Sequence, residues 1–528
     1  MELDDRALPL TRGQRDIWLA QKTGSFGAKW QLGELIRVGG AIDPGLLRRS
    51  IVQAVREAEP LRSGFFEVDG EVLQKPLDYP DVELAQYDLT DSQDPALDAY
   101  RLASSIQRTL MPLAGPLFKF SLMQTRTDEF YFFACCHHIV VDGIGITLVC
   151  HRIAAIYNAI ASGESIPPAF FGSLRGLIDC ESEYEASTDY LDDQAYWAKN
   201  LPPESEPRRR LAPDVVDDRD LDGPSEPIQL DPSAVAGIQA LSKGLGIRRS
   251  SVITAACALL VRAFDTESSE VVLDFPVSRR VRPETLMVAG MISGFVPLTL
   301  KTSPESALDA FCEKVDTQMR GALQHQRFPV HTIDYKARLR GSGQASNRFV
   351  VNFIPATHMS DLAGAPVSGT LTHAGPVEFG LVFFRDDDRL FLGTVGPGQF
   401  FSNSDVRELA KRLERVLVAM AADAGRLLSS IDVLDAGERV RLAQLGNQAG
   451  SAGSGAVVSI PGLFAEQVEQ TPEAVAVSVA GGESMTYRQL DAAANRLAQL
   501  LAARGVGAGQ CVALLVSRSP AAIVAIVA

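Results

Sequence analysis

The stretch "YFFACCHHIVVDGIGITLV", residues 131–149, places His137, His138, Asp142 and Gly143 within seven positions in an otherwise apolar run. The apolar residues before this cluster predict a buried strand, and "GITLVCHRIAAIYNAIASG" after it predicts a helix. Successive side chains of a strand point to opposite faces, so the two histidines cannot both face one cavity. The sequence therefore predicts one chemical and one structural histidine.

Asp142 ends the apolar run, where an unpaired carboxylate would be costly, so it needs a cation. The basic candidates lie elsewhere in the chain, notably in "PVSRRVRP", residues 276–283. Gly143 lets the backbone turn sharply and approach a ligand closely. The alternative is a structural one, in which two hydrogen-bonded core histidines are followed by an Asp-Gly turn.

Composition narrows the class of protein. The chain has 528 residues, a length that favours about three or four domains of roughly 150 residues. Its net charge of −15 disfavours nucleic-acid binding. The acidic N-terminus has no signal-peptide pattern, and no uninterrupted apolar stretch reaches the ~18 residues that cross a bilayer. Seven cysteines without zinc-ligand spacing complete the prediction of a cytoplasmic protein with reduced thiols, no metal site and no membrane association.

Strand and helix patterns alternate along the chain. A hairpin is predicted at 116–141, a boundary between two halves near 200–230, and strands at "EVVLDFPVS", "RFVVNFIP" and "LVFFRDDDRLFLGTV". A Gly/Ser/Ala-rich linker follows at 446–456, and the last residues resemble a strand and the beginning of a helix. The apolar end of the sequence suggests a cut through a further domain.

Other catalytic classes fit the cluster poorly. The sequence contains no G-x-S-x-G elbow and no G-x-x-x-x-G-K-[ST] phosphate loop. Adjacent histidines without further spaced ligands make poor metal geometry. What remains is acyl transfer in which a histidine acts as a base or hydrogen-bonding partner, without a covalent enzyme intermediate.

The pattern H-H-x-x-x-D-G resembles the signature of condensation domains of nonribosomal peptide synthetases. Further segments recur in the family's order over roughly residues 8–435. They are "LPLTRGQRDIWLAQ" with Gln14 and Trp18, "EAEPLRSGFF", "DDQAYWAKNL", "PVSRRVRP", "GMISGFVPL", "QHQRFP" and "NRFVVNF".

Two residues depart from the family's motifs. Gly294 replaces the asparagine of G-M-F-V-N-T-L-P-L, and Arg279 replaces the glycine before the motif arginine of P-V-S-G-R-x-x-P. Both fall in the segment that lies close to the substrate tunnel in the family. Donor or acceptor preference is therefore expected to differ from that of the commonest peptide-extending type.

The resemblance implies a role for each residue of the cluster. His138 would be the active-site histidine that faces the tunnel, and His137 the structural one. Asp142 would pair with Arg280 and hold the loop, and the Gly143 N–H would contact the reacting carbonyl or the oxyanion. Three further residues would line the tunnel, namely Gly290, Gly294 and Asn352.

The resemblance also implies an architecture. The fold would be α/β, a two-lobed chloramphenicol acetyltransferase-like pseudo-dimer with a tunnel between the lobes. The lobes are expected at 1–200 and 201–445 and a linker at 446–458. Residues 459–528 resemble the beginning of an adenylation domain, also α/β, in which "MTYRQLDAAANRLA" is similar to the first core motif. ATP and Mg²⁺ would bind only in the part of that domain beyond residue 528.

The predicted reaction is amide formation between two thioesters carried on phosphopantetheine arms, and the condensation domain itself would bind no cofactor. The donor carrier protein would come in trans, and the acceptor carrier domain would lie downstream in the full-length protein. The sequence resembles starter-type domains of catechol-siderophore synthetases, which implies an aryl donor such as 2,3-dihydroxybenzoate. A fatty-acyl or peptidyl donor, an epimerisation domain, a plant-type acyltransferase and a non-catalytic carrier-protein docking module remain alternatives.

Overall fold

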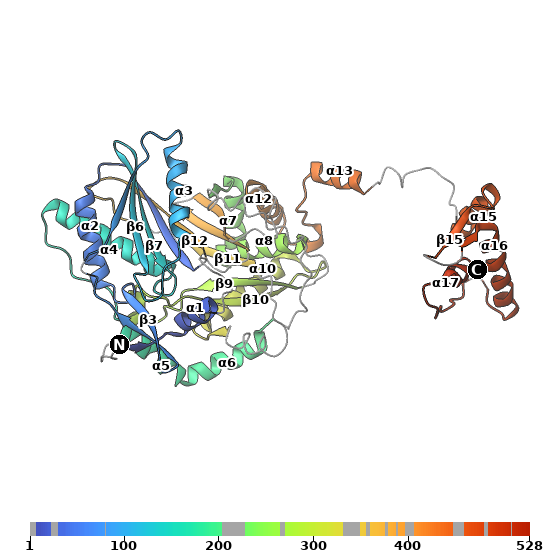
Figure 1. The fold of residues 1–528 in the computed structure, drawn as a ribbon, viewed down its shortest axis with the longest axis horizontal. Helices are drawn as coiled ribbons and strands as arrows, with labels where there is room; N and C mark the ends of the chain where they lie inside the picture. The colour runs from blue at the N-terminus through green and yellow to red at the C-terminus, as the bar shows by residue number, and fades with distance from the viewer. Residues whose placement is uncertain are drawn as a thin grey trace. The chain divides into compact units, whose positions relative to one another are not determined.

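The structure is a computed structural model. It describes residues 7–22, 30–79, 81–202, 227–264, 270–330, 349–354, 359–374, 379–386, 389–395, 406–446, 459–479, 484–507 and 509–528. The chain forms two compact units, Met1–Leu434 and Asp435–Ala528, which are described separately below (Figure 1).

The first lobe of the larger unit is built on a five-stranded mixed sheet with the strand order β12-β2-β7-β6-β5. Every residue of its strand β7 is buried, which explains the uninterrupted apolar run before the histidines. Figure 1 shows α2 and α4 on one side of this sheet and α3 on the other. The expected hairpin is confirmed as β6 and β7. The strands are β2 (Gln31–Val38), β5 (Leu84–Asp88), β6 (Phe118–Arg126), β7 (Glu129–His137) and β12 (Val367–Ala374).

The helices of the first lobe begin and end at residues that satisfy their free backbone groups. Asp43 accepts hydrogen bonds from the N–H groups of Gly45 and Leu46 at the start of α2. Gly163, with φ of 73°, ends α4 in the left-handed conformation, as its sequence position predicts. These helices are α1 (Arg12–Lys22), α2 (Pro44–Glu57), α3 (Pro95–Gln107), α4 (Gly143–Ser162), α5 (Leu174–Glu185) and α6 (Thr188–Asn200). A small sheet joins β1 (Leu8–Pro9), β4 (Glu71–Pro76) and β3 (Ser63–Val68).

The second lobe has a six-stranded sheet with the order β10-β9-β11-β13-β14-β8. The expected single strand at "LVFFRDDDRLFLGTV" is in fact two strands, β13 and β14, which pair antiparallel from Gly380 opposite Val395 to Asp386 opposite Arg389. The strands are β8 (Ile228–Gln229), β9 (Glu270–Val277), β10 (Gly294–Lys301), β11 (Phe349–Ile354), β13 (Phe379–Asp386) and β14 (Arg389–Val395). The helices are α7 (Pro232–Leu245), α8 (Arg249–Phe264), α9 (Pro283–Leu286), α10 (Leu308–Gln324), α12 (Val406–Ala422) and the 3₁₀ turn η2 (Leu428–Ser430).

One strand from the second half of the chain joins the sheet of the first lobe, which corrects the expected division between residues 200 and 201. β12 comes from the second half of the chain but pairs antiparallel with β2 over the whole of both strands. Leu362 and Ala365, just before β12, belong to the hydrophobic core of the first lobe. The crossing strand covers β2, which would otherwise be an exposed edge.

The apolar helix α4 is a core helix of the first lobe. Among the described helices it is long and apolar enough to cross a membrane, and the bent pair α7 and α8 would pass the same test together. Most of α4 is buried, however, where it packs against α2, β2 and β7. Its composition therefore reflects the interior of the lobe.

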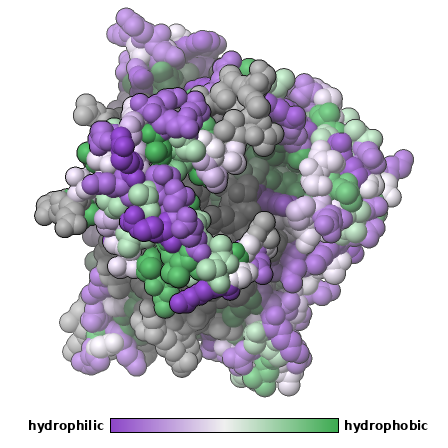
Figure 2. All heavy atoms as spheres, turned by 90° about the vertical axis from the view of Figure 1, so that its right-hand side faces the viewer, coloured by the Kyte–Doolittle hydropathy of each residue, from purple (hydrophilic) through white to green (hydrophobic). Residues whose placement is uncertain are grey.

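The smaller unit contains four helices and a two-stranded sheet among its described residues. It begins at Asp435, so its first helix lies ahead of the boundary expected at 445, and the expected linker lies outside the described residues except for Gly446. The expected strand after residue 510 does not form, and several of its apolar side chains are exposed. Figure 2 shows one face of the molecule, on which hydrophobic residues lie at the surface among hydrophilic ones. The elements are α13 (Ala436–Leu445), α15 (Ile460–Gln470), β15 (Val475–Ser478), β16 (Ser484–Thr486), α16 (Tyr487–Ala503) and α17 (Pro520–Val527).

Candidate active site

The polar cluster lies where β7 ends and α4 begins. β7 ends at His137, and the N–H of His138 donates to the carbonyl of Trp30 at 2.8 Å. After a turn, Asp142 is the N-cap of α4, and its Oδ1 accepts the N–H of Gly145 at 2.8 Å. The sequence therefore forms the strand–turn–helix junction that it predicts.

The two histidines lie in different environments. His137 is 2% exposed, and its Nδ1 accepts the N–H of Ile139 at 3.1 Å. Burial and the neighbouring His138 lower the pKa of His137 to about 3, so its ring is neutral. With one ring nitrogen already bonded to the backbone and the side chain enclosed, His137 has a structural environment.

His138 is partly exposed, in contrast to His137. Desolvation lowers its pKa, while the charge of Asp142 and hydrogen bonds to the backbone of His138 and Val141 act in the opposite direction. The imidazole is therefore mainly neutral near pH 7 and can accept a proton or a hydrogen bond. Its pKa depends on where the Asp142 carboxylate is held.

The expected ion pair between Asp142 and Arg280 is present. The two guanidinium nitrogens Nη1 and Nη2 lie 2.6 and 2.8 Å from Oδ2 and Oδ1 of Asp142. The same carboxylate accepts the N–H groups of Ile292 at 3.1 Å and Ser293 at 2.9 Å. Arg280 also donates to the carbonyls of Val288 and Gly290. This bidentate pair therefore fixes the start of α4 to the 288–293 segment of the second lobe.

The pKa of Asp142 follows from these contacts. Burial alone would raise it, but the charge and hydrogen bonds of Arg280 and the N–H donors of Gly145 and Ser293 hold it below its usual value. Asp142 is fully buried and permanently ionised at neutral pH. It holds the loop and is not placed to act as a base.

The two glycines at the start of α4 differ in the space that a side chain would have. A Cβ at Gly145 would lie 2.6 Å from Cγ2 of Val141 and 3.2 Å from the carbonyl oxygen of Gly290, so only glycine fits there. A Cβ at Gly143 would meet no atom within 4 Å. Gly143 is the first residue of α4, where the backbone N–H has no intrahelical acceptor. Its N–H therefore belongs to the positive end of a long helix.

The expected tunnel residues lie on two separate segments. Gly290 accepts the N–H of Asp142 at 3.3 Å, and Gly294 begins β10 opposite Val277 of β9. Asn352 lies on β11, opposite Val382 of β13. The structure thus places Gly290 beside the cluster, Gly294 one residue beyond Ser293, and Asn352 on a different strand of the same sheet as Gly294.

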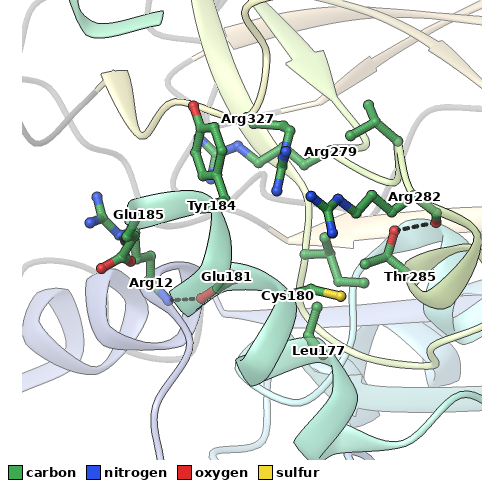
Figure 3. Close-up of a pocket in the computed structure, with 12 residues that line it drawn as sticks. Arg12, Leu177, Cys180, Glu181, Tyr184, Glu185, Arg279, Arg282, Thr285 and Arg327 are labelled. Carbon is green, nitrogen blue, oxygen red and sulfur yellow. Dashed lines mark hydrogen bonds and ion pairs between the residues drawn. The ribbon is translucent and has the colours of Figure 1, made fainter. Parts of the chain in front are cut away.

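One neighbouring residue was not predicted as part of the site. The guanidinium of Arg279 lies against Gly294. Arg279 also lines a small cavity together with Arg12, Arg282 and Arg327 (Figure 3). The only signal in the sequence is that both positions depart from the family's motifs. That signal indicates an altered site but not a contact between the two residues.

Comparison with known proteins agrees with this geometry. The family model described as "Condensation domain" matches residues 5–443, and that described as "AMP-binding enzyme" matches residues 464–528. The chain is 27% identical to a dimodular nonribosomal peptide synthase of Bacillus subtilis over 98% of this chain and 22% of that protein. It is also 27% identical to enterobactin synthase component F of Escherichia coli, over 97% of this chain and 40% of that protein. The chain therefore spans less than half the length of these relatives.

Solved structures show the same fold. The first condensation domain of the calcium-dependent antibiotic synthetase, in complex with a substrate analogue, has a TM-score of 0.72 and 26% identity over 81% of this chain and 100% of that chain. A mutant of the starter condensation domain of rhizomide synthetase RzmA, in complex with C8-CoA, has a TM-score of 0.70 and 26% identity over 81% of this chain and 98% of that chain. The expected two-lobed fold is confirmed, and the chain belongs to the condensation domain family, followed by a segment of the AMP-binding enzyme family.

Proposed function

We propose that this chain catalyses amide bond formation in nonribosomal peptide synthesis. The amine of an aminoacyl thioester attacks the carbonyl carbon of an acyl thioester, an amide bond forms, and the donor thiolate leaves and takes up a proton. Both thioesters are carried on phosphopantetheine arms of carrier proteins, the donor in trans and the acceptor from a downstream domain. The observation that carries the proposal is that a partly exposed, neutral His138 lies just before the N-terminus of α4 in the same loop.

The residues support this reaction in distinct ways. A neutral His138 accepts a hydrogen bond from the attacking amine and takes up charge as the amide forms. The N–H of Gly143 is a donor for the negative oxygen of the tetrahedral intermediate. Asp142 and Arg280 hold both groups in place from behind.

The proposed donor is an aryl thioester such as 2,3-dihydroxybenzoyl on a separate carrier protein. The resemblance to starter domains of catechol-siderophore synthetases and the likeness to enterobactin synthase component F support this choice. A second candidate is a fatty-acyl donor, because the similar RzmA starter domain was solved with C8-CoA. We also propose a cytoplasmic location, consistent with the free thiols of all seven cysteines.

Intact-protein mass spectrometry tests the proposal. The chain is mixed with an aminoacyl-loaded acceptor carrier and a donor carrier loaded with either 2,3-dihydroxybenzoate or octanoate. We expect the acceptor carrier to gain the mass of the aryl group, and to gain it faster than the octanoyl group. Faster octanoyl transfer would replace the aryl donor with a fatty-acyl one. Carrier binding without any mass transfer would contradict catalysis and favour the docking module, and exchange of the α-proton would favour epimerisation.

A further inference from the structure

The backbone of Arg279 has an unusual conformation. Its φ is 54°, and among the described residues only Asp69 and Ala363 are other non-glycine residues with positive φ. The left-handed region is unfavourable for a residue with a Cβ. The family's motif has glycine here, so this chain retains a glycine conformation with an arginine side chain. A compensating contact of that side chain is therefore expected.

The side chain of Arg279 fills the space that a side chain at position 294 would occupy. A Cβ built on Gly294 would lie 2.7 Å from Nη1 of Arg279 and would overlap both Cζ and Nη2. Arg279 is fixed in this place because Nε donates to the carbonyl of Gln326 at 3.1 Å and its own N–H donates to Oε1 of Gln326 at 3.2 Å. A side chain at 294 would therefore displace the guanidinium of Arg279 from this position.

This contact joins two strands at the point where each supplies a partner to Asp142. Arg279 precedes Arg280, whose guanidinium binds both carboxylate oxygens, and Gly294 follows Ser293, whose N–H binds Oδ2. Val277, at the end of β9, lies opposite Gly294, at the start of β10. Arg279 thus contacts both backbone segments that hold Asp142 at the start of α4, the one with Arg280 and the one with Ser293.

The other arginines at this cavity have partners of their own. Arg12 pairs with Glu185, Arg282 pairs with Glu183 at 3.1 Å, and the guanidinium of Arg327 lies 3.9 Å from the ring centre of Tyr184. Figure 3 shows Arg279 on the β9 side of the cavity, facing the helix that carries Glu181 and Tyr184. Arg279 differs from them because its guanidinium lies over the backbone of Gly294, next to the site.

We propose that Arg279 is a positioning residue for the condensation reaction and that it forms an obligate pair with Gly294. The proposal rests on the function proposed above. The guanidinium takes the place of the side chain missing at 294 and keeps Arg280 and the Ser293 N–H aligned on Asp142. Asp142 in turn orients His138 and Gly143. The family's glycine and asparagine can replace this pair only together.

A double-mutant cycle on the full chain tests the pair. Arg279→Gly leaves the space over Gly294 empty, and Gly294→Asn forces the guanidinium out, so each single variant is expected to lower kcat about tenfold. The double variant restores the family's pair and is expected to recover most of the lost kcat. Arg282→Ala is the matched control, because Arg282 lines the same cavity but forms an exposed ion pair, and it is expected to leave kcat unchanged.

Positioning and mere stabilisation give different results. Positioning predicts that kcat per folded molecule falls while KM for both loaded carriers stays unchanged, and that the double variant reverses the fall. A purely structural role predicts lower Tm values with normal kcat of the folded fraction, which would overturn the positioning claim. Losses that simply multiply in the double variant, or single variants with normal kcat, would overturn the obligate pair.

The inference and the proposed function can fail separately. If the wild-type chain forms no amide with any loaded carrier, the proposed function fails and the positioning claim fails with it. The obligate pair is then decided by the Tm values of the same four proteins. Tm losses that are reversed in the double variant would support the pair, and additive losses would overturn it.

Discussion

Asp142 shows how the chemistry of the loop depends on a buried charge. Its carboxylate has no solvent exposure, and it binds Arg280 and three backbone N–H groups. Removing one partner of such a pair leaves the other charge buried without compensation. The pair therefore matters less as a source of net stability than as the device that holds His138 and Gly143.

Asp142→Asn is predicted to destabilise the larger unit by about 3–5 kcal/mol, because Arg280 keeps its buried charge and loses its counter-ion. Urea unfolding followed by tryptophan fluorescence measures the change. Glu183→Gln breaks the exposed pair with Arg282 and is the control, with an expected change of about 0–1 kcal/mol. Equal effects of the two substitutions would show that the buried pair does not anchor the loop.

Gly143 offers a substitution pair that isolates one N–H group. Gly143→Ala has open space for its Cβ and keeps the donor, so kcat should stay near that of the wild type. Gly143→Pro removes the donor at a helix position that tolerates proline, after a residue that is already extended (Asp142, ψ −177°). We predict a kcat lower by about 10²–10³ with an unchanged Tm. Normal amide formation by the proline variant would remove Gly143 from the chemistry.

Among the secondary-structure elements, α4 and the strands beneath it belong both to the site and to the hydrophobic core of the first lobe. Glu34 of β2 is only 4% exposed and lies against Thr147 and Cys150 of α4. Burial raises its pKa to about 7, although hydrogen bonds from these two residues act against the shift. Glu34 is therefore a neutral acid in the native protein below this pH and an anion in a desolvated position above it.

Glu34→Gln is predicted to remove a pH dependence of stability. A carboxyl group whose pKa is raised by folding contributes no penalty below its unfolded value of about 4.5, and the penalty grows as pH rises through about 7. The variant should match the wild type at pH 4.5 and exceed its unfolding free energy at pH 8.5 by roughly 3 kcal/mol. The measurement is urea unfolding at both pH values. A difference that does not change with pH would contradict a buried neutral Glu34.

The elements that could be predicted from the sequence are those whose signals lie within a short stretch of the chain. The β6–β7 hairpin and its junction with α4 are predictable because the spacing of apolar residues, the apolar run before the histidines and the terminal Gly163 are all local features. The need of Asp142 for a cation, and the candidate stretch 276–283, follow from the residues themselves, but the choice of Arg280, 138 residues away, came only from the family resemblance. The pairing of β12 with β2 and the contact of Arg279 with Gly294 have no local signal in the sequence, because both depend on which distant strands pair.

At the scale of the whole molecule, the larger unit holds every residue assigned to the reaction. Its lobes are joined by the β12–β2 pairing, by Asp142 with Arg280, and by Trp197, whose Nε1 donates to the carbonyl of His325 at 2.8 Å. Trp197 and His325 lie in two of the family's motifs, so the resemblance indicates structural residues as well as chemical ones.

A chain shortened to residues 1–434 is therefore predicted to condense loaded carriers with the same kcat as the full chain, since the described site lies wholly within this unit. Steady-state turnover of both proteins, with circular dichroism to verify folding, measures this. A folded but inactive short chain would show that the second unit contributes to the reaction.

The most direct test of the central claim is single-turnover amide formation by wild type and His138→Ala, read from the intact mass of the acceptor carrier protein. We expect the wild-type chain to transfer the donor acyl group to the acceptor. We expect His138→Ala, with an unchanged Tm, to lose most of this rate at saturating carriers. Full transfer by His138→Ala would contradict a role for His138 in the reaction.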